Sequence, residues 1–118
     1  MAFRLILRFR PLAYSSGDTD KVAVETTARK IDQVLIDNTS GTSQVYLRLY
    51  DVASGSVTLG TTSPDVILPC AAGAKCDYSF QPANAFSTAI TANLTISTAA
   101  AQFSAVTSTV TFTILTSA

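Results

Sequence analysis

The chain has 118 residues, 47% of them hydrophobic and only 14% charged, and its eight basic residues balance eight acidic ones. This length and hydrophobicity predict one packed domain rather than a disordered tail. The lack of net charge argues against nucleic-acid binding, because that affinity comes mainly from neutralising phosphates. The absence of histidine removes the most common general base at neutral pH, so the composition argues against an enzyme.

The N-terminal residues 3–10 alternate between an apolar face and a largely cationic one. The apolar face carries Phe3, Leu5, Leu7 and Phe9, and the other face carries Arg4, Ile6, Arg8 and Arg10. Because the arginines interrupt the apolar residues, the segment fits neither a signal peptide nor a membrane span. We expect a strand that Pro11 ends or marks as a sheet edge. With the polar residues that follow, it forms an arm over residues 1–20, and residues 21–118 form the domain.

The next segments predict a weak strand at 21–27, a clearer one at 31–37 and a strong one at 44–51. The turn-rich residues 38–43 favour a hairpin between the last two. In the strand at 44–51, period-2 alternation puts Val45, Leu47 and Leu49 on the buried face. Tyr46, Arg48 and Tyr50 fall on the other face.

The second half of the chain continues as short strands separated by turns. We expect strands at 57–59, 66–68, 77–80, most of 85–97 and 107–116, with a turn at 81–84 and either a helical turn or a loop at 99–105. The last strand buries Val110, Phe112 and Ile114. This spacing predicts an all-β fold of two packed antiparallel sheets, either a β-sandwich or a jelly roll, in a single domain with an N-terminal strand arm.

Cys70 and Cys76 flank a short loop and leave two alternatives open. They form a local disulfide if the loop stems bring their Cα atoms close enough, or they remain reduced thiols, as the cytosol would favour. Two cysteines without histidine supply at most half of a tetrahedral zinc shell. Asp18 and Asp20 lack the further ligands of a calcium loop. We therefore expect no metal, no cofactor and no catalytic residue.

Tyr46 and Tyr50 share one face of their strand and also permit two interpretations. They either stack on a sugar or pack against the sheet or a partner subunit. The arginines at positions 4, 8 and 10, with Phe3 and Phe9, could contact single-stranded nucleic acid. Pairing with carboxylates of a neighbouring subunit explains them at least as well.

Several segments between residues 31 and 98 resemble, in order, a pattern in small structural proteins of tailed bacteriophages. The run Val45-Tyr46-Leu47-Arg48-Leu49-Tyr50-Asp51 resembles VYLKLYD in those proteins. The run Gly60-Thr61-Thr62-Ser63-Pro64-Asp65 resembles GTTAPD, and Leu68-Pro69 with the glycine-bearing loop resembles LPVPAG. Finally, Phe80-Gln81-Pro82 and Ala85-Phe86-Ser87-Thr88-Ala89 resemble the F-P-x-G-x-AFSTG segment. The chain departs from the pattern at Asn84 and Ala89, where glycine is common, and in its two cysteines.

The resemblance implies a non-enzymatic virion protein, namely a capsid decoration (cement) protein with a β-sandwich. It implies the major capsid protein as a partner, location on the capsid surface, and host cytoplasm during assembly. The low net charge favours association with further copies of the chain, as a trimer or dimer. The interface residues expected on this basis are Phe3, Arg4, Arg8, Arg10, Tyr46 and Tyr50. The alternative is a neck, tail or fibre module that binds host-surface carbohydrate. Neither implies nucleic-acid or membrane binding.

Overall fold

The computed structural model describes residues 8–14, 22–58, 61–96 and 110–117. These residues form an all-β structure with one short 3-10 turn, η1, at Ser54–Ser56. The strands are β1 (Arg8–Tyr14), β2 (Val22–Glu25), β3 (Arg29–Asp37), β4 (Val45–Tyr50), β5 (Val66–Cys70), β6 (Lys75–Phe86), β7 (Ile90–Thr95) and β8 (Val110–Ser117).

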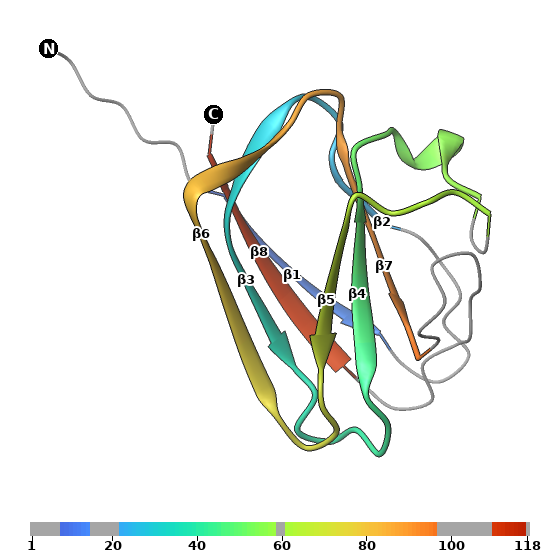
Figure 1. Cartoon of the computed structure of the whole chain (residues 1–118), viewed down its shortest axis with the longest axis vertical. Helices are drawn as coiled ribbons and strands as arrows, with labels where there is room; N and C mark the ends of the chain where they lie inside the picture. The colour runs from blue at the N-terminus through green and yellow to red at the C-terminus, as the bar shows by residue number, and fades with distance from the viewer. Residues whose placement is uncertain (1–7, 15–21, 59–60, 97–109, 118) are drawn as a thin grey trace, which may run out of the picture.

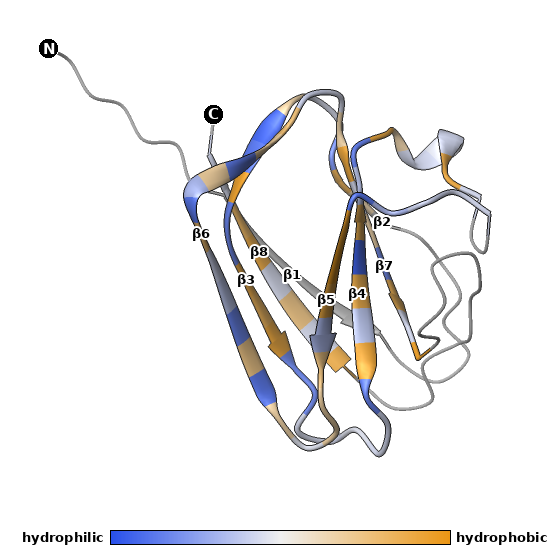
Figure 2. Ribbon diagram, viewed as in Figure 1, coloured by the Kyte–Doolittle hydropathy of each residue, from blue (hydrophilic) through white to orange (hydrophobic). Residues whose placement is uncertain are grey.

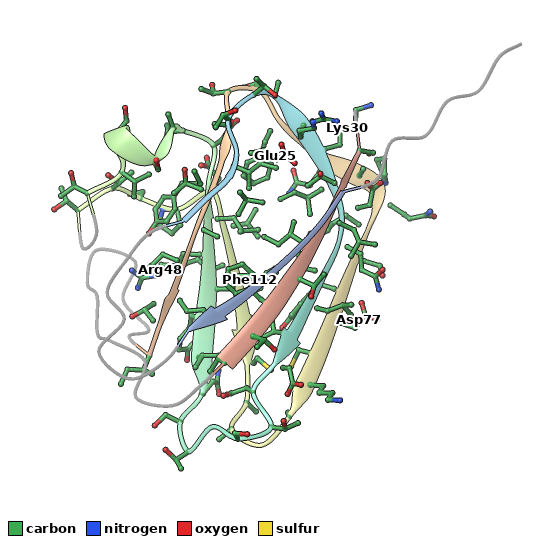
Figure 3. All side chains as sticks on the ribbon, turned by 180° about the vertical axis from the view of Figure 1, so that it is seen from behind. Glu25, Lys30, Arg48, Asp77 and Phe112 are labelled. Atoms are coloured by element: carbon green, nitrogen blue, oxygen red, sulfur yellow. The ribbon has the colours of Figure 1, made fainter. Side chains whose placement is uncertain are left out.

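The strands lie in two four-stranded antiparallel sheets (Figure 1). One sheet has the order β1-β8-β3-β6, and the other has the order β2-β7-β4-β5. Apolar side chains from both sheets meet in one buried cluster, and Phe112 of β8 lies between the sheets in Figure 3. The predicted fold of two packed antiparallel sheets in one domain is therefore confirmed.

The alternation of apolar residues correctly predicts the core. Val45, Leu47, Leu49, Val110, Phe112 and Ile114 are each no more than 1% exposed. Strand β3 contributes Ile31, Val34 and Ile36 to the same cluster. The alternating colours along β8 in Figure 2 show the two-residue period, because successive side chains of a strand point to opposite faces.

Strand β1 is an edge strand, as Pro11 indicated. It pairs with β8 from Arg8 opposite Thr116 to Tyr14 opposite Val110. The strand continues through Pro11, which lies opposite Thr113, instead of ending there. A proline without an N–H is tolerated because β1 has a neighbour on one side only. Residues 3–7 and 15–20 of the expected arm lie outside the described residues, so the division at residue 20 stays a prediction.

The hairpin expected across residues 38–43 is wrong, because β3 and β4 lie in different sheets. The side chain of Asn38 fastens the connection that crosses between the sheets. Its amide donates hydrogen bonds to the carbonyl oxygens of Cys70 (3.2 Å) and Ala71 (3.1 Å) at the start of the β5–β6 connection. These bonds hold the β3–β4 connection against a second connection that also crosses between the sheets.

Two further segments differ from the sequence prediction. The strand expected at 57–59 is not formed at Val57 and Thr58, which follow η1 as irregular chain, and Leu59 lies outside the described residues. The turn expected at 81–84 instead lies within β6. There the register with β3 shifts, so that Ser79 lies opposite Gln33 and Asn84 opposite Ile31. The extra residues of β6 are accommodated as a bulge, which a turn-like composition does not distinguish from a loop.

Candidate interaction surface

The six residues expected at an interface do not form one described surface. Phe3 and Arg4 lie outside the described residues. Arg8 and Arg10 lie on the edge strand β1, opposite Thr116 and Ile114 of β8. Tyr46 and Tyr50 lie on β4 in the other sheet, where Tyr46 is half-buried and Tyr50 is fully buried.

Tyr50 is buried because the chain that follows β4 covers the second face of this strand. Thr91, opposite Tyr50 in β7, donates a hydrogen bond from its hydroxyl to the carbonyl oxygen of Val52 (2.7 Å). The chain that follows β4 thus returns across this part of the sheet. Arg48 is also buried, at 1% exposed, and lies beside β4 and β7 on the side of the molecule away from Asp77 (Figure 3). The two tyrosines therefore do not form an exposed platform for sugar stacking.

The opposite sheet carries an open groove of about 310 Å³ on its outer face. Outward-pointing side chains of β3, β6 and β8 line it: Leu35, Asp37, Lys75, Asp77, Thr111 and Thr113. Leu35 is 38% exposed, while the surrounding side chains are polar. The alternation over residues 107–116 puts threonines on the outer face of the last strand, but it could not combine them with β3 and β6 because the strand order was unknown.

The charged groups of this groove are already partnered within the chain. Asp77 accepts a hydrogen bond from the Gln33 amide (2.8 Å), and the Lys75 ammonium lies 4.0 Å from the Asp37 carboxylate. The hydroxyl of Thr39 donates to the same Asp37 carboxylate (2.6 Å). The hydrogen bonds from Thr39 lower the pKa of Asp37, and Lys75 adds to the shift. Asp37 is thus held ionised, which suits surface contacts rather than proton transfer.

A second carboxylate, Asp51 at the end of β4, joins three of the segments that carry the phage resemblance. Its carboxylate accepts hydrogen bonds from the backbone N–H groups of Ser87 (3.0 Å), Thr88 (2.8 Å) and Ala89 (3.4 Å). The hydroxyl of Ser87 adds a fourth bond (3.1 Å). The backbone N–H of Asp51 in turn donates to the carboxylate of Asp65 (2.6 Å). The Asp51 carboxylate thus caps the β6–β7 turn, and the Asp51 backbone is held by Asp65, just before β5.

These bonds also set the ionisation of Asp51. Partial burial acts to raise the pKa of its carboxyl, but the backbone N–H donors of Ser87, Thr88 and Ala89 outweigh it and leave the pKa lowered. Hydrogen bonds to the charged form of a carboxyl favour that form. An aspartate at the end of a strand commonly bonds its own neighbouring backbone, whereas the partners of Asp51 lie on a distant turn.

A buried amide holds the opposite end of the sandwich. Asn38 is fully buried, and its side-chain amide donates to Ser43 (3.0 Å) as well as to the β5–β6 connection. Its backbone carbonyl accepts from Gly41 (3.0 Å) and Gly73 (2.9 Å). Gly73 has φ of 75°, a conformation that favours glycine. Asn38 therefore fixes two connections at once.

Cys70 and Cys76 are free thiols. Cys70 is buried at the end of β5, and Cys76 is half-buried in β6, so the two belong to different sheets. Burial, together with the neighbouring Cys76 thiol, raises the pKa of Cys70 to about 12. Burial and the two cysteines also raise the pKa of Tyr78, whose hydroxyl donates to the carbonyl oxygen of Pro69. Cys70 is therefore an unreactive thiol at neutral pH.

Among residues 8–14, 22–58, 61–96 and 110–117, no three metal-ligating side chains come together. The expected loop aspartates Asp18 and Asp20 fall outside these ranges. None of the helical structure in the same ranges is long and apolar enough to cross a membrane. No family model, curated protein or solved structure matches this chain.

Proposed function

We propose that this chain is a non-enzymatic structural protein of a tailed-phage virion, a decoration protein that binds the outer capsid surface and clamps neighbouring capsomers. The observation that carries the proposal is the contact among three of the resembling segments. Asp51 ends the first, Asp65 ends the second, and Ser87–Ala89 belong to the last. The likeness thus falls on residues that hold the sandwich together.

The departures at Asn84 and Ala89 are compatible with this proposal. In the described part of the chain, no residue other than glycine has a positive φ, so neither position needs the conformational freedom of glycine. Ala89 still donates its N–H to Asp51.

The proposal includes a jelly-roll topology, which the strand orders support. A jelly roll is a double-sheet arrangement of eight strands in two Greek keys and is common in viral capsid domains. The orders β1-β8-β3-β6 and β2-β7-β4-β5 place the first and last strands side by side. They send every connection between consecutive strands, except β4–β5, from one sheet to the other.

The proposed activity is surface burial rather than chemistry. A protein that binds only the assembled shell stabilises it by mass action, and an oligomer on a lattice axis multiplies weak contacts. The outer face of the β1-β8-β3-β6 sheet, with Leu35 among polar and threonine side chains, is the surface we assign to the major capsid protein.

The test is to mix the purified protein with empty shells of the phage that encodes it and to measure co-sedimentation and shell melting. We expect saturable binding and a raised melting temperature, both weakened by Leu35→Asp. Ile67→Asp, at a similarly exposed apolar residue on β5 of the other sheet, is the matched control and should bind as the wild type does. Cryo-electron microscopy of virions then locates the protein. Density confined to the neck, tail or fibres, or no binding to shells, would refute the decoration role.

The carbohydrate-binding alternative needs exposed tyrosines, such as Tyr46, Tyr50 or Tyr78, as stacking platforms. Tyr50 is fully buried, and the hydroxyl of the half-buried Tyr78 is bonded to Pro69. Binding of the protein to host polysaccharide, without binding to shells, would favour that alternative over ours.

A further inference from the structure

The long strand β6 leaves one edge of its sheet open. Within the described ranges it pairs with β3 alone and ends the order β1-β8-β3-β6. The backbone groups on the free side of an edge strand can pair with an added strand. The run 75–80 lacks proline, so every backbone N–H group on its free side can donate a hydrogen bond. By contrast, Pro11 and Pro69 interrupt the edge strands β1 and β5.

The two faces of this edge differ in chemistry. On the inner side, Cys76, Tyr78 and Phe80 pack against the core but are only half-buried. On the outer side, Lys75 and Asp77 are both exposed, and Asp77 projects away from the sandwich beside β6 (Figure 3). A strand that fits this edge should be apolar on its inner face and, on its outer face, cationic opposite Asp77 and uncharged opposite Lys75.

The sequence of the chain contains such a strand just before β1. Phe3, Leu5 and Leu7 alternate with Arg4 and Ile6. In an antiparallel register with Leu5 opposite Cys76, Phe3 falls opposite Tyr78 and Arg4 opposite Asp77. Aromatic pairs and opposite charges directly across an antiparallel ladder are both stabilising.

The segment cannot reach this position on its own chain. Arg8, Thr116, Ile31 and Asn84 form one row across the sheet, so a strand added to β6 lies about four strand spacings, or about 19 Å, from β1. Cys76 lies a further five residues of β3, or about 17 Å, along the sheet. The three residues from Arg8 back to position 5 span at most about 11 Å. Only a second copy can supply the strand.

We propose that residues 2–7 of one copy add as an antiparallel strand to the free edge of β6 of another copy, with Arg4 facing Asp77 and Leu5 facing Cys76. The added strand covers the half-buried side chains of β6. It also pairs the backbone groups of an edge that could otherwise aggregate with strands of other proteins. This inference deepens the self-association that belongs to the proposed function but does not depend on capsid binding. The tests therefore use the purified full chain alone.

The first test is a crosslink under mild oxidation by glutathione disulfide, in a Cys70→Ala background that removes competition from the second native thiol. Two thiols lose their protons and two electrons to glutathione disulfide, which leaves as two reduced glutathione molecules. We expect Leu5→Cys to form an intermolecular disulfide with Cys76, identified by peptide mass spectrometry. The matched control is Ile6→Cys, which the register directs to the opposite face. Equal crosslinking by both variants, or none by Leu5→Cys, would overturn the proposal.

The second test needs no change in the core. Arg4→Asp should weaken self-association about tenfold in sedimentation equilibrium, because an attractive cross-strand pair becomes repulsive. Combining it with Asp77→Arg should restore most of the loss. Lys30→Glu, an exposed charge reversal away from residues 75–80, should leave association unchanged. A monomeric wild type, or a double variant no better than Arg4→Asp, would refute strand exchange while leaving capsid binding to be judged on shells.

Discussion

Single polar residues hold distant segments of this chain together. Asp51 supports a turn some 36 to 38 residues further along, and Asn38 reaches the connection between β5 and β6. Both were visible in the sequence as turn-type residues, for which local backbone bonds are the usual expectation. Their actual partners could not be predicted, because the approach of distant segments depends on which strands become neighbours.

We expect Asp51→Asn to destabilise the domain by about 1–2 kcal/mol, because the amide replaces an ionised acceptor of several N–H groups on a partly exposed site. The folded-state pKa of Asp51 is lowered from its ordinary 3.8. Its contribution is therefore fully present above the unfolded-state pKa and is lost as pH falls through the folded-state pKa.

Urea unfolding of both proteins between pH 7 and pH 3 measures this difference. The gap between wild type and Asp51→Asn should narrow as the solution becomes acidic, whereas exposed Asp77→Asn should change stability by less than about 0.5 kcal/mol. A gap that stays constant down to pH 3 would mean that the charge of Asp51 is not what stabilises the turn.

The two thiols should react at different rates. At pH 8, iodoacetamide should label the half-buried Cys76 before the buried Cys70, whose pKa is about 12, because the thiolate is the reactive form. Peptide mass spectrometry after timed alkylation reads out both sites, and unfolding in urea should equalise them. The same experiment without reductant detects a Cys70–Cys76 disulfide, which would appear as a pair resistant to labelling in both states.

At the scale of strands, the two-residue period was a reliable guide where one face of a strand meets the core. It identified β4 and β8 and the inward residues that were predicted for them. It failed to describe β7, in which all six residues are buried, since a strand covered on both faces has no exposed side to alternate with. The two-residue period could not predict which sheet a strand joins. Consecutive strands carry the same pattern whether they form a hairpin or lie in different sheets.

The connection after β3 should be sensitive to small changes. In Gly41→Ala the new methyl group would lie 1.8 Å from the Asn38 side-chain oxygen, so the amide must move. Asn38→Ala leaves three carbonyl oxygens without their donor and should cost about 2–3 kcal/mol. Ser40→Ala, on the exposed part of the same turn, is the control. Thermal melting of the three variants would contradict this assignment if Asn38→Ala melted with the control.

At the scale of the whole molecule, we expect residues 2–7 to serve self-association and the sandwich to fold without them. Deleting residues 2–7 spares every pair of the β1–β8 ladder, so we expect an unchanged melting temperature. Self-association measured by sedimentation should fall, and binding to shells should weaken with it. A deletion of residues 2–10 also removes the pairs at Arg8, Phe9 and Arg10 and should lower the melting temperature. If the shorter deletion already prevents folding, residues 2–7 belong to the core of their own domain.

The interior position of β8 has a consequence for how the chain acquires its structure. Strand β8 is hydrogen-bonded between β1 and β3, so the first sheet cannot be completed until residues 110–117 have been made. Contacts between residues so far apart in the sequence form only after a large loop has closed, and loop closure costs entropy before the contacts stabilise the fold. We therefore expect folding in the slow, millisecond-to-second regime of all-β proteins. During that interval the apolar strands made earlier lack their partner, and synthesis of many copies at once would expose them to aggregation.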